Sequence, residues 1–171
     1  MKSFIVGFSK AKSPWKIGSQ VIREVENRDY SHVYIKFYSK SLDRTLIYEA
    51  VGSGVRFIGQ EKWKNHAIEM HSYDLEISDE SYIKLMQFCV DNAGEEYAFC
   101  QNLGVVIAKV FNLEKNPFQK GQNCSEITGE LLKLEGFRIC KDINLVTPKD
   151  IKRILDHNQD KATKNTEDRL G

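Results

Sequence analysis

At residues 121–134 the chain reads Gly-Gln-Asn-Cys-Ser-Glu-Ile-Thr-Gly-Glu-Leu-Leu-Lys-Leu, a loop that runs into a helix. Asn123 is a favoured N-cap residue, and Glu126 follows at the spacing of a capping box. Gly136 is placed to end the helix. Apolar residues recur between these two signals at helical spacing: Ile127, Leu131 and Leu134. The pattern therefore predicts a helix whose first residue is Cys124, with Ser125 and Glu126 serving the helix start.

A cysteine at the first position of a helix has unusual chemistry. The unpaired N–H groups and the positive end of the helix dipole favour a thiolate over a thiol. Cys124 is thus a candidate nucleophile that lacks only a base. The alternative is a small buried apolar residue, because free cysteines are often buried. The local sequence leaves both interpretations open.

Length and composition indicate one ordinary globular domain. The 171 residues are 41% hydrophobic and 29% charged, and 25 basic against 24 acidic residues leave a net charge of +1. This balance gives no electrostatic case for a nucleic acid as the main partner. From His157 onward the chain is almost wholly polar. We therefore expect a domain over residues 1–155 and a polar, disordered tail over residues 156–171.

The cysteines and apolar runs bear on the cellular compartment. The four cysteines, at positions 89, 100, 124 and 140, form no Cys-x-x-Cys pair and no metal-finger spacing, although an even count leaves disulfides open. The apolar run near Met1 is too short for a secretory signal, and no run reaches membrane-spanning length. We expect a cytoplasmic, reduced protein without stable membrane insertion. His66 and His71 have no recognised ligand spacing, so no metal or cofactor is expected.

A second informative stretch supplies a base. Residues 30–38 alternate so that Val33, Ile35 and Phe37 share one face and His32 begins the other, polar face. A histidine at the start of a strand is well placed to reach a cleft. A surface histidine is the alternative.

The next strand, residues 45–51, is the expected hairpin partner and carries Glu49 on the same face as Ile47 and Val51. A carboxylate among β-branched neighbours is costly to bury without a partner. A hydrogen bond to His32 would satisfy it and would orient the imidazole, as in a catalytic triad. An exposed edge position for Glu49 is the competing account.

The same patterns predict the remaining elements. Strands are expected at residues 2–8, 55–58, 67–75 and 137–140, and helices at residues 13–27, 79–93 and 101–111 and from Pro148 onward, with a helical turn around Trp63. The helix over residues 79–93 is expected to bury Ile83, Met86, Phe88 and Val90, with Cys89 also in the core.

Three pieces in the order His, Glu, Cys resemble a known family. Tyr30-Ser31-His32, Tyr48-Glu49-Ala50 and Asn123-Cys124-Ser125-Glu126 are similar to the motifs of the circularly permuted NlpC-type papain-like cysteine hydrolases. Within this superfamily the sequence most resembles the YiiX-like branch, and lecithin retinol acyltransferase is a more distant relative. Trp63, the Gly94–Tyr97 piece and the Thr-Pro-x-Asp start of the last helix also fit that branch. The resemblance covers roughly residues 1–155.

The resemblance implies a fold and a chemistry. The fold would be α+β: an antiparallel sheet of about five or six strands, which could be rolled toward a barrel, with helices packed on it. Cys124 would be the nucleophile, His32 the general base and then acid, and Glu49 its orienting partner. The backbone N–H of Cys124 would help to hold the oxyanion, with Gln122 or Tyr97 as an added side-chain donor.

The resemblance also implies candidate substrates. The leading hypothesis is a thiol protease or amidase that cleaves a peptide or peptidoglycan-type peptide through an acyl-enzyme, without a cofactor or metal. A thioesterase or acyltransferase acting on lipid-like acyl substrates would use the same three residues. A non-catalytic binding module that kept the fold is the alternative from another functional class.

Overall fold

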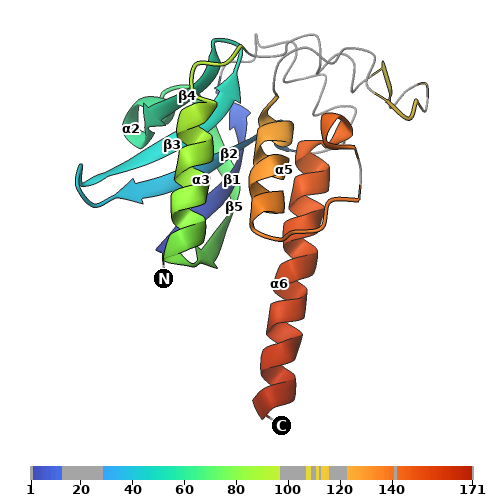
Figure 1. Cartoon of the computed structure of the whole chain (residues 1–171). Helices are drawn as coiled ribbons and strands as arrows, with labels where there is room; N and C mark the ends of the chain where they lie inside the picture. Colours follow the sequence, from blue (N-terminus) through green and yellow to red (C-terminus); the bar gives the residue numbers. More distant parts are fainter. Residues whose placement is uncertain are drawn as a thin grey trace.

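A five-stranded antiparallel sheet forms the centre of the protein (Figure 1). The computed structural model describes residues 2–12, 29–96, 107–108, 111, 113–115, 123–140 and 142–170, with side chains of the last helix described to Gln159. The strands are β1 (Lys2–Ala11), β2 (His32–Ser39), β3 (Arg44–Val51), β4 (Gly54–Gly59) and β5 (Ala67–Ile77). Their order is β4-β3-β2-β1-β5, so β4 and β5 are the two edges of an open sheet.

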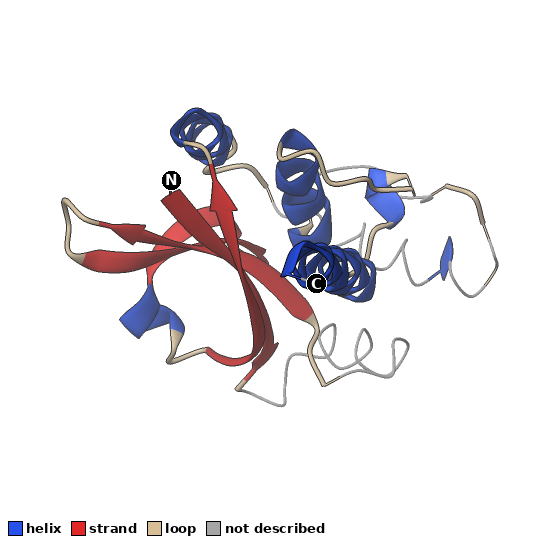
Figure 2. Ribbon diagram, turned by 90° about the horizontal axis from the view of Figure 1, so that it is seen from below, coloured by secondary structure: helices blue, strands red, loops and turns tan. Residues whose placement is uncertain are grey.

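The helices lie on both sides of this sheet (Figure 2). They are α2 (Gln60–Trp63), α3 (Asp79–Asp91), α5 (Cys124–Leu134) and α6 (Pro148–Leu170), with a 3-10 turn at Ile143–Leu145. Helix α5 packs against β2 and β3, α3 packs against β1 and α5, and α6 packs against α5. The short α2 packs instead against β3 and β4. The described part of the chain is thus α+β, as predicted.

The alternation along β2 divides the interior into two clusters. Val33, Ile35 and Phe37 belong to the main core, together with side chains from α3, α5 and α6. The opposite face of β2 carries Tyr34, which is 1% exposed in a smaller cluster. That cluster also contains Ile47, Ile58 and Trp63. The face predicted to be polar is therefore covered at Tyr34, because α2 brings Trp63 over it.

Helix α3 turns inward only part of the stripe that the sequence predicted: Met86 and Phe88 pack against the main core. It begins after the predicted cap Ser78, whose side chain accepts a hydrogen bond from the Ser81 N–H. Its buried residues are Leu85 and Cys89, whereas Ile83 and Val90 are 56% and 60% exposed. The inward placement of Ile83 and Val90 was wrong. The buried pair lies four residues apart, on one helix face, and the exposed pair lies on another.

Two other segments differ from prediction. Residues 137–140 form no strand, although Phe137 and Ile139 still pack against the core. A short apolar alternation can be satisfied by packing alone when no neighbouring strand offers hydrogen bonds. The predicted helices at 13–27 and 101–111 fall wholly or largely outside the described residues.

Helix α6 continues beyond the predicted domain boundary. Ile151 and Leu155 are buried as expected, and Tyr73 of β5 donates a hydrogen bond to Asp156. The backbone stays helical to Leu170, where a disordered tail was expected. The C-terminal part of the helix projects away from the sheet (Figure 1). Local helix propensity thus extends the element after its apolar anchors have ended.

Gly7 allows Tyr34 to lie across β1. The two residues are register partners in neighbouring strands, and a Cβ added to Gly7 would lie 2.2 Å from the Tyr34 ring. We expect Gly7→Ala to reduce the free energy of unfolding by about 1–3 kcal/mol through overpacking. Urea denaturation measures the change. Gly59→Ala is the matched control, because a Cβ there meets no atom within 4 Å; equal stability of the two variants would contradict this account.

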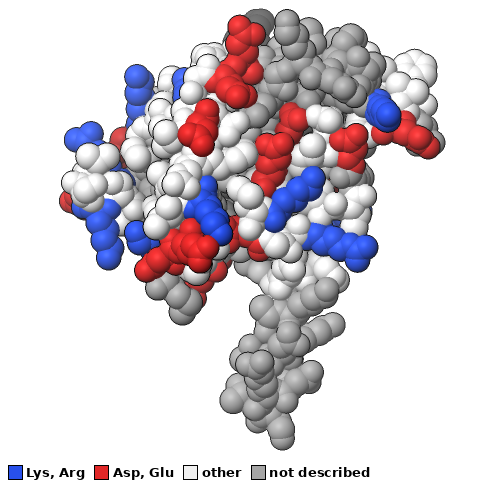
Figure 3. Space-filling view, in the orientation of Figure 1, with Lys and Arg blue, Asp and Glu red and all other residues white. Residues whose placement is uncertain are grey.

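Charges of both signs are interspersed on the surface seen in Figure 3. Together with the net charge of +1, this distribution gives no electrostatic reason to propose a nucleic acid partner. None of the helices among the described residues has the length and apolar character needed to cross a membrane.

Candidate active site

Cys124 is the first residue of α5, where the sequence predicted it. Asn123 caps the helix: its Oδ1 accepts from the N–H groups of Ser125 and Glu126, both at 2.9 Å. The Glu126 carboxylate returns to the Asn123 N–H at 3.4 Å and completes the capping box. Gly136 follows the helix with a φ of +81°. These contacts fix the helix start and leave the Cys124 N–H at its positive end.

The sulfur of Cys124 faces the beginning of β2. It lies within hydrogen-bonding reach of the His32 side chain and of the Val33 backbone N–H, and its Sγ is 4.0 Å from the Ser125 Oγ. Burial alone would raise the pKa of this thiol, but the imidazolium charge and these donors outweigh burial and lower the pKa below its ordinary value of 9.0. The surroundings therefore favour a thiolate.

His32 joins the sulfur to a carboxylate. Its Nε2 is 3.1 Å from the Glu49 Oε2, which leaves Nδ1 as the ring nitrogen available to Cys124. Burial would lower the pKa of His32, but the charges and hydrogen bonds of Cys124 and Glu49 raise the pKa far above its ordinary value of 6.5. The imidazole thus favours its protonated form, as the thiol favours its ionised form. The pair has the character of a thiolate–imidazolium ion pair.

Glu49 is buried and fully engaged. It is 3% exposed, and its Oε2 accepts from His32 and, at 3.1 Å, from the Trp63 Nε1. Its Oε1 accepts from the Arg56 Nε at 3.1 Å and the Arg56 Nη2 at 2.8 Å. Burial would raise the pKa of Glu49, but His32 and Arg56 lower it to about 2. The competing account of an exposed edge carboxylate was wrong.

Tyr34 supports the imidazole from the side. The Tyr34 and His32 rings lie nearly parallel, with an interplanar angle of 23° and centroids 6.2 Å apart. Trp63 also packs against the tyrosine, with ring centroids 4.6 Å apart. The Tyr34 hydroxyl donates to Glu69, which also binds the Lys36 Nζ at 2.6 Å. Packing therefore restricts the rotation of both the His32 and the Tyr34 side chains.

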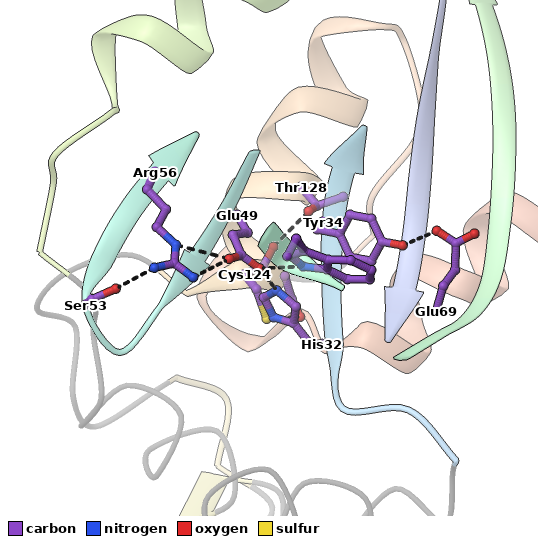
Figure 4. A network of polar contacts seen from close by, with 10 residues as sticks. His32, Tyr34, Glu49, Ser53, Arg56, Glu69, Cys124 and Thr128 are labelled. Carbon is purple, nitrogen blue, oxygen red and sulfur yellow. Dashed lines mark hydrogen bonds and ion pairs between the residues drawn. The ribbon is translucent and has the colours of Figure 1, made fainter. Parts of the chain in front are cut away.

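Figure 4 shows Arg56, Glu49 and His32 as a connected row, with the Cys124 sulfur beside the imidazole. The three predicted residues therefore meet, although their catalytic roles stay predictions. Tyr97 and Gln122, predicted as binding residues, lie outside the described residues. Arg56 was missed, but a signal existed: a turn at Gly52–Ser53 places Arg56 directly opposite Glu49 in the hairpin, which is the observed register.

The stability of the protein should depend on Glu49 ionisation. The folded pKa of about 2 lies below the ordinary value of 4.5, so ionisation stabilises the fold above pH 4.5, and this contribution is lost as the pH falls through 2. We expect Glu49→Gln to unfold with a free energy lower by roughly 3 kcal/mol near neutral pH. The difference from wild type should shrink between pH 4.5 and pH 2 in urea titrations.

The control for this titration is Glu61→Gln, because the Glu61 side chain is 86% exposed and pairs only with Lys64 three residues away among the described residues. This variant should differ little from wild type at any pH. A Glu49→Gln difference that does not change with pH would show that the lost contribution is not electrostatic.

No three His, Cys, Asp or Glu side chains within the described ranges gather as a metal-binding group would require. The donors that converge at the site are instead arranged around one sulfur and one carboxylate. A nucleophile, a base and an orienting group would need such an arrangement. The chain matches no protein-family model and no curated protein.

Proposed function

We propose that the protein is a cysteine hydrolase that cleaves an amide bond in a peptide or peptidoglycan-type peptide. The observation that carries the proposal is the contact of Cys124 with His32, whose other ring nitrogen binds a buried carboxylate. A thiol that favours ionisation beside an imidazole that favours protonation is a nucleophile ready at neutral pH. The circularly permuted NlpC-type papain-like fold, in its YiiX-like form, is part of this proposal.

The reaction follows from the protonation states. The Cys124 thiolate attacks the carbonyl carbon, and the C=O π electrons move to the oxygen. The Cys124 N–H at the helix start donates to that oxyanion; such a donor is typically worth ~10²–10³ in rate. When the C–N bond breaks, His32 gives its proton to the departing amine, and an acyl-thioester remains on Cys124. Neutral His32 then removes a proton from water, and the resulting attack releases the acid and restores the thiolate.

Glu49 has a supporting role in this scheme. Its hydrogen bond to Nε2 keeps Nδ1 directed at the sulfur and stabilises the imidazolium. Glu49→Gln should therefore retain partial activity. The described cysteines Cys89, Cys124 and Cys140 are all free, which is the usual state in a reducing compartment, and a cytoplasmic site of action is part of the proposal.

The test combines labelling with a substrate panel. A cysteine-reactive activity probe should modify Cys124 faster than Cys140 at neutral pH, as resolved by peptide mass spectrometry. Peptide amides, muropeptides, acyl-thioesters and lipid esters are then compared, with an acyl adduct on Cys124 as the readout. Turnover of amides supports the proposal. Turnover of thioesters or lipids alone would replace it with the thioesterase or acyltransferase, and labelling of Cys124 no faster than Cys140 would overturn it.

A further inference from the structure

Arg56 contacts the site without reaching the reacting atoms. It stands on β4 directly opposite Glu49 of β3, and two of its nitrogens bind the same carboxylate oxygen, Oε1. The other oxygen, Oε2, is shared by His32 and Trp63. The two oxygens of Glu49 thus serve different partners: one holds the imidazole and the other holds a permanent cation.

This arrangement produces four alternating charges. In order they are the Cys124 thiolate, the His32 imidazolium, the Glu49 carboxylate and the Arg56 guanidinium, and their sum is zero. Without the guanidinium, the remaining three would carry a net negative charge around a carboxylate that is 3% exposed. Excess charge in a poorly solvated place is relieved by proton uptake. The thiolate is the stronger base of the two anions, because a thiol is a weaker acid than a carboxylic acid, so the thiolate would take the proton.

We infer that Arg56 is a positioning residue that acts through Glu49 to keep Cys124 ionised, an inference that rests on the proposed hydrolase chemistry. An arginine suits this role because its guanidinium stays charged throughout the working pH range and grips one oxygen with two donors. The side chain is 38% exposed, so the cation keeps part of its hydration while the carboxylate loses nearly all of its own. The partly exposed guanidinium thereby offsets the free-energy cost of burying the Glu49 carboxylate.

The other groups facing this cluster do not replace Arg56. Tyr34 and Trp63 contribute no cation, and burial together with Glu69 raises the pKa of Tyr34, which stays protonated. The Lys36 ammonium is already bound to Glu69 at 2.6 Å. Within the described parts of the chain, Arg56 is therefore the only permanent cation on Glu49.

The test measures the pH dependence of iodoacetamide alkylation at Cys124, which requires no substrate. We expect Arg56→Met to move the apparent pKa of Cys124 upward by about one unit, so that alkylation on the acidic side of the transition slows about tenfold. Arg56→Gln should do the same, and Arg56→Lys should retain most of the wild-type profile because it keeps the charge. Arg153→Met is the matched control, since the Arg153 side chain is 77% exposed on α6.

A second background tests whether the effect passes through Glu49. In Glu49→Gln there is no carboxylate to neutralise, so adding Arg56→Met should change the Cys124 profile little. An equal shift in both backgrounds would mean that the Arg56 charge acts on Cys124 directly and not through Glu49, and it would overturn the inference. Unchanged alkylation in Arg56→Met, or an equal loss in Arg56→Lys, would also overturn it. If Arg56→Met does not fold, Arg56→Gln provides the same comparison.

Chemical rescue adds a readout that a purely structural role would not move. Guanidinium chloride at low, non-denaturing concentration should restore the alkylation rate of Arg56→Ala, whereas sodium chloride at equal ionic strength should not. Failure of this inference is distinguishable from failure of the proposed function. In the first case wild-type Cys124 still has a lowered pKa that Arg56 does not affect; in the second the wild-type thiol itself behaves as an ordinary cysteine.

Discussion

Replacing Cys124 with alanine is expected to abolish hydrolysis, with a fall in kcat/KM of at least ~10³-fold. The sulfur supplies the electron pair that forms the acyl-enzyme, and no neighbouring group can take its place at the helix start. The fold should survive, because the lost atom is small and the capping box of Asn123 and Glu126 does not involve it. Steady-state kinetics on the best substrate of the panel measures the loss, and thermal unfolding measures stability.

The same variant changes the titration of its partner. Cys124 and Glu49 both raise the pKa of His32, and Cys124 has the larger effect. Without the thiolate only Glu49 remains, so the pKa of His32 should fall. Histidine NMR signals followed against pH report this shift. Cys140→Ala is the control, since Cys140 is exposed and has no part in the proposed mechanism. Full activity in Cys124→Ala would place the chemistry elsewhere in the molecule.

Replacing His32 with alanine is expected to lower kcat by ~10²–10⁴-fold, the usual contribution of a general acid–base group. Two effects combine: the thiol loses the imidazolium that lowers its pKa, and the leaving amine loses its proton donor. Iodoacetamide alkylation of Cys124 should then begin only near the pH at which a thiol of ordinary or raised pKa ionises. Burst-phase kinetics should show that acylation is the slowed step.

The control for this variant is His71→Ala. His71 lies on β5 with a 41% exposed side chain, and its Nε2 is 3.7 Å from the Asp29 carboxylate. It should leave both turnover and the alkylation profile of Cys124 unchanged. If His71→Ala reduced activity as strongly as His32→Ala, a general loss of stability would explain both results and the assignment of His32 as the base would fail.

Several features of the fold could be predicted because they depend on neighbours in the sequence. The capping box at Asn123 and Glu126 and the stop at Gly136 are formed within one helix, so the order of residues is sufficient to place them. The alternation that separates Val33 and Ile35 from His32 and Tyr34 is likewise a property of a single strand. Helix α3 shows the limit, since its apolar residues lie on more than one face. The packing of α3 against α5 and β1 buries Leu85 and leaves Ile83 and Val90 exposed.

The site itself was only partly predictable. Glu49 stood out as a carboxylate between apolar residues, which is costly without a partner. Its partner His32 followed from the hairpin, but the exposed-edge alternative could be removed only by the observed burial. Trp63 of α2 donates the hydrogen bond to Glu49 that no local pattern predicts. Arg56 of β4 also binds Glu49, and the turn at Gly52–Ser53 was enough to place these two residues opposite each other.

The sequence by itself determined that a cysteine opens a helix, that a histidine opens a strand and that a carboxylate occupies the next strand. Local hydrogen bonding and periodicity decide these things, and they act over a few residues. Only the tertiary structure decided that sulfur, imidazole, carboxylate and guanidinium stand in one row. That arrangement requires the packing of α5 against β2, which is set by burial of the whole core rather than by any single segment. The register of β3 with β4, in contrast, follows from the turn that joins them.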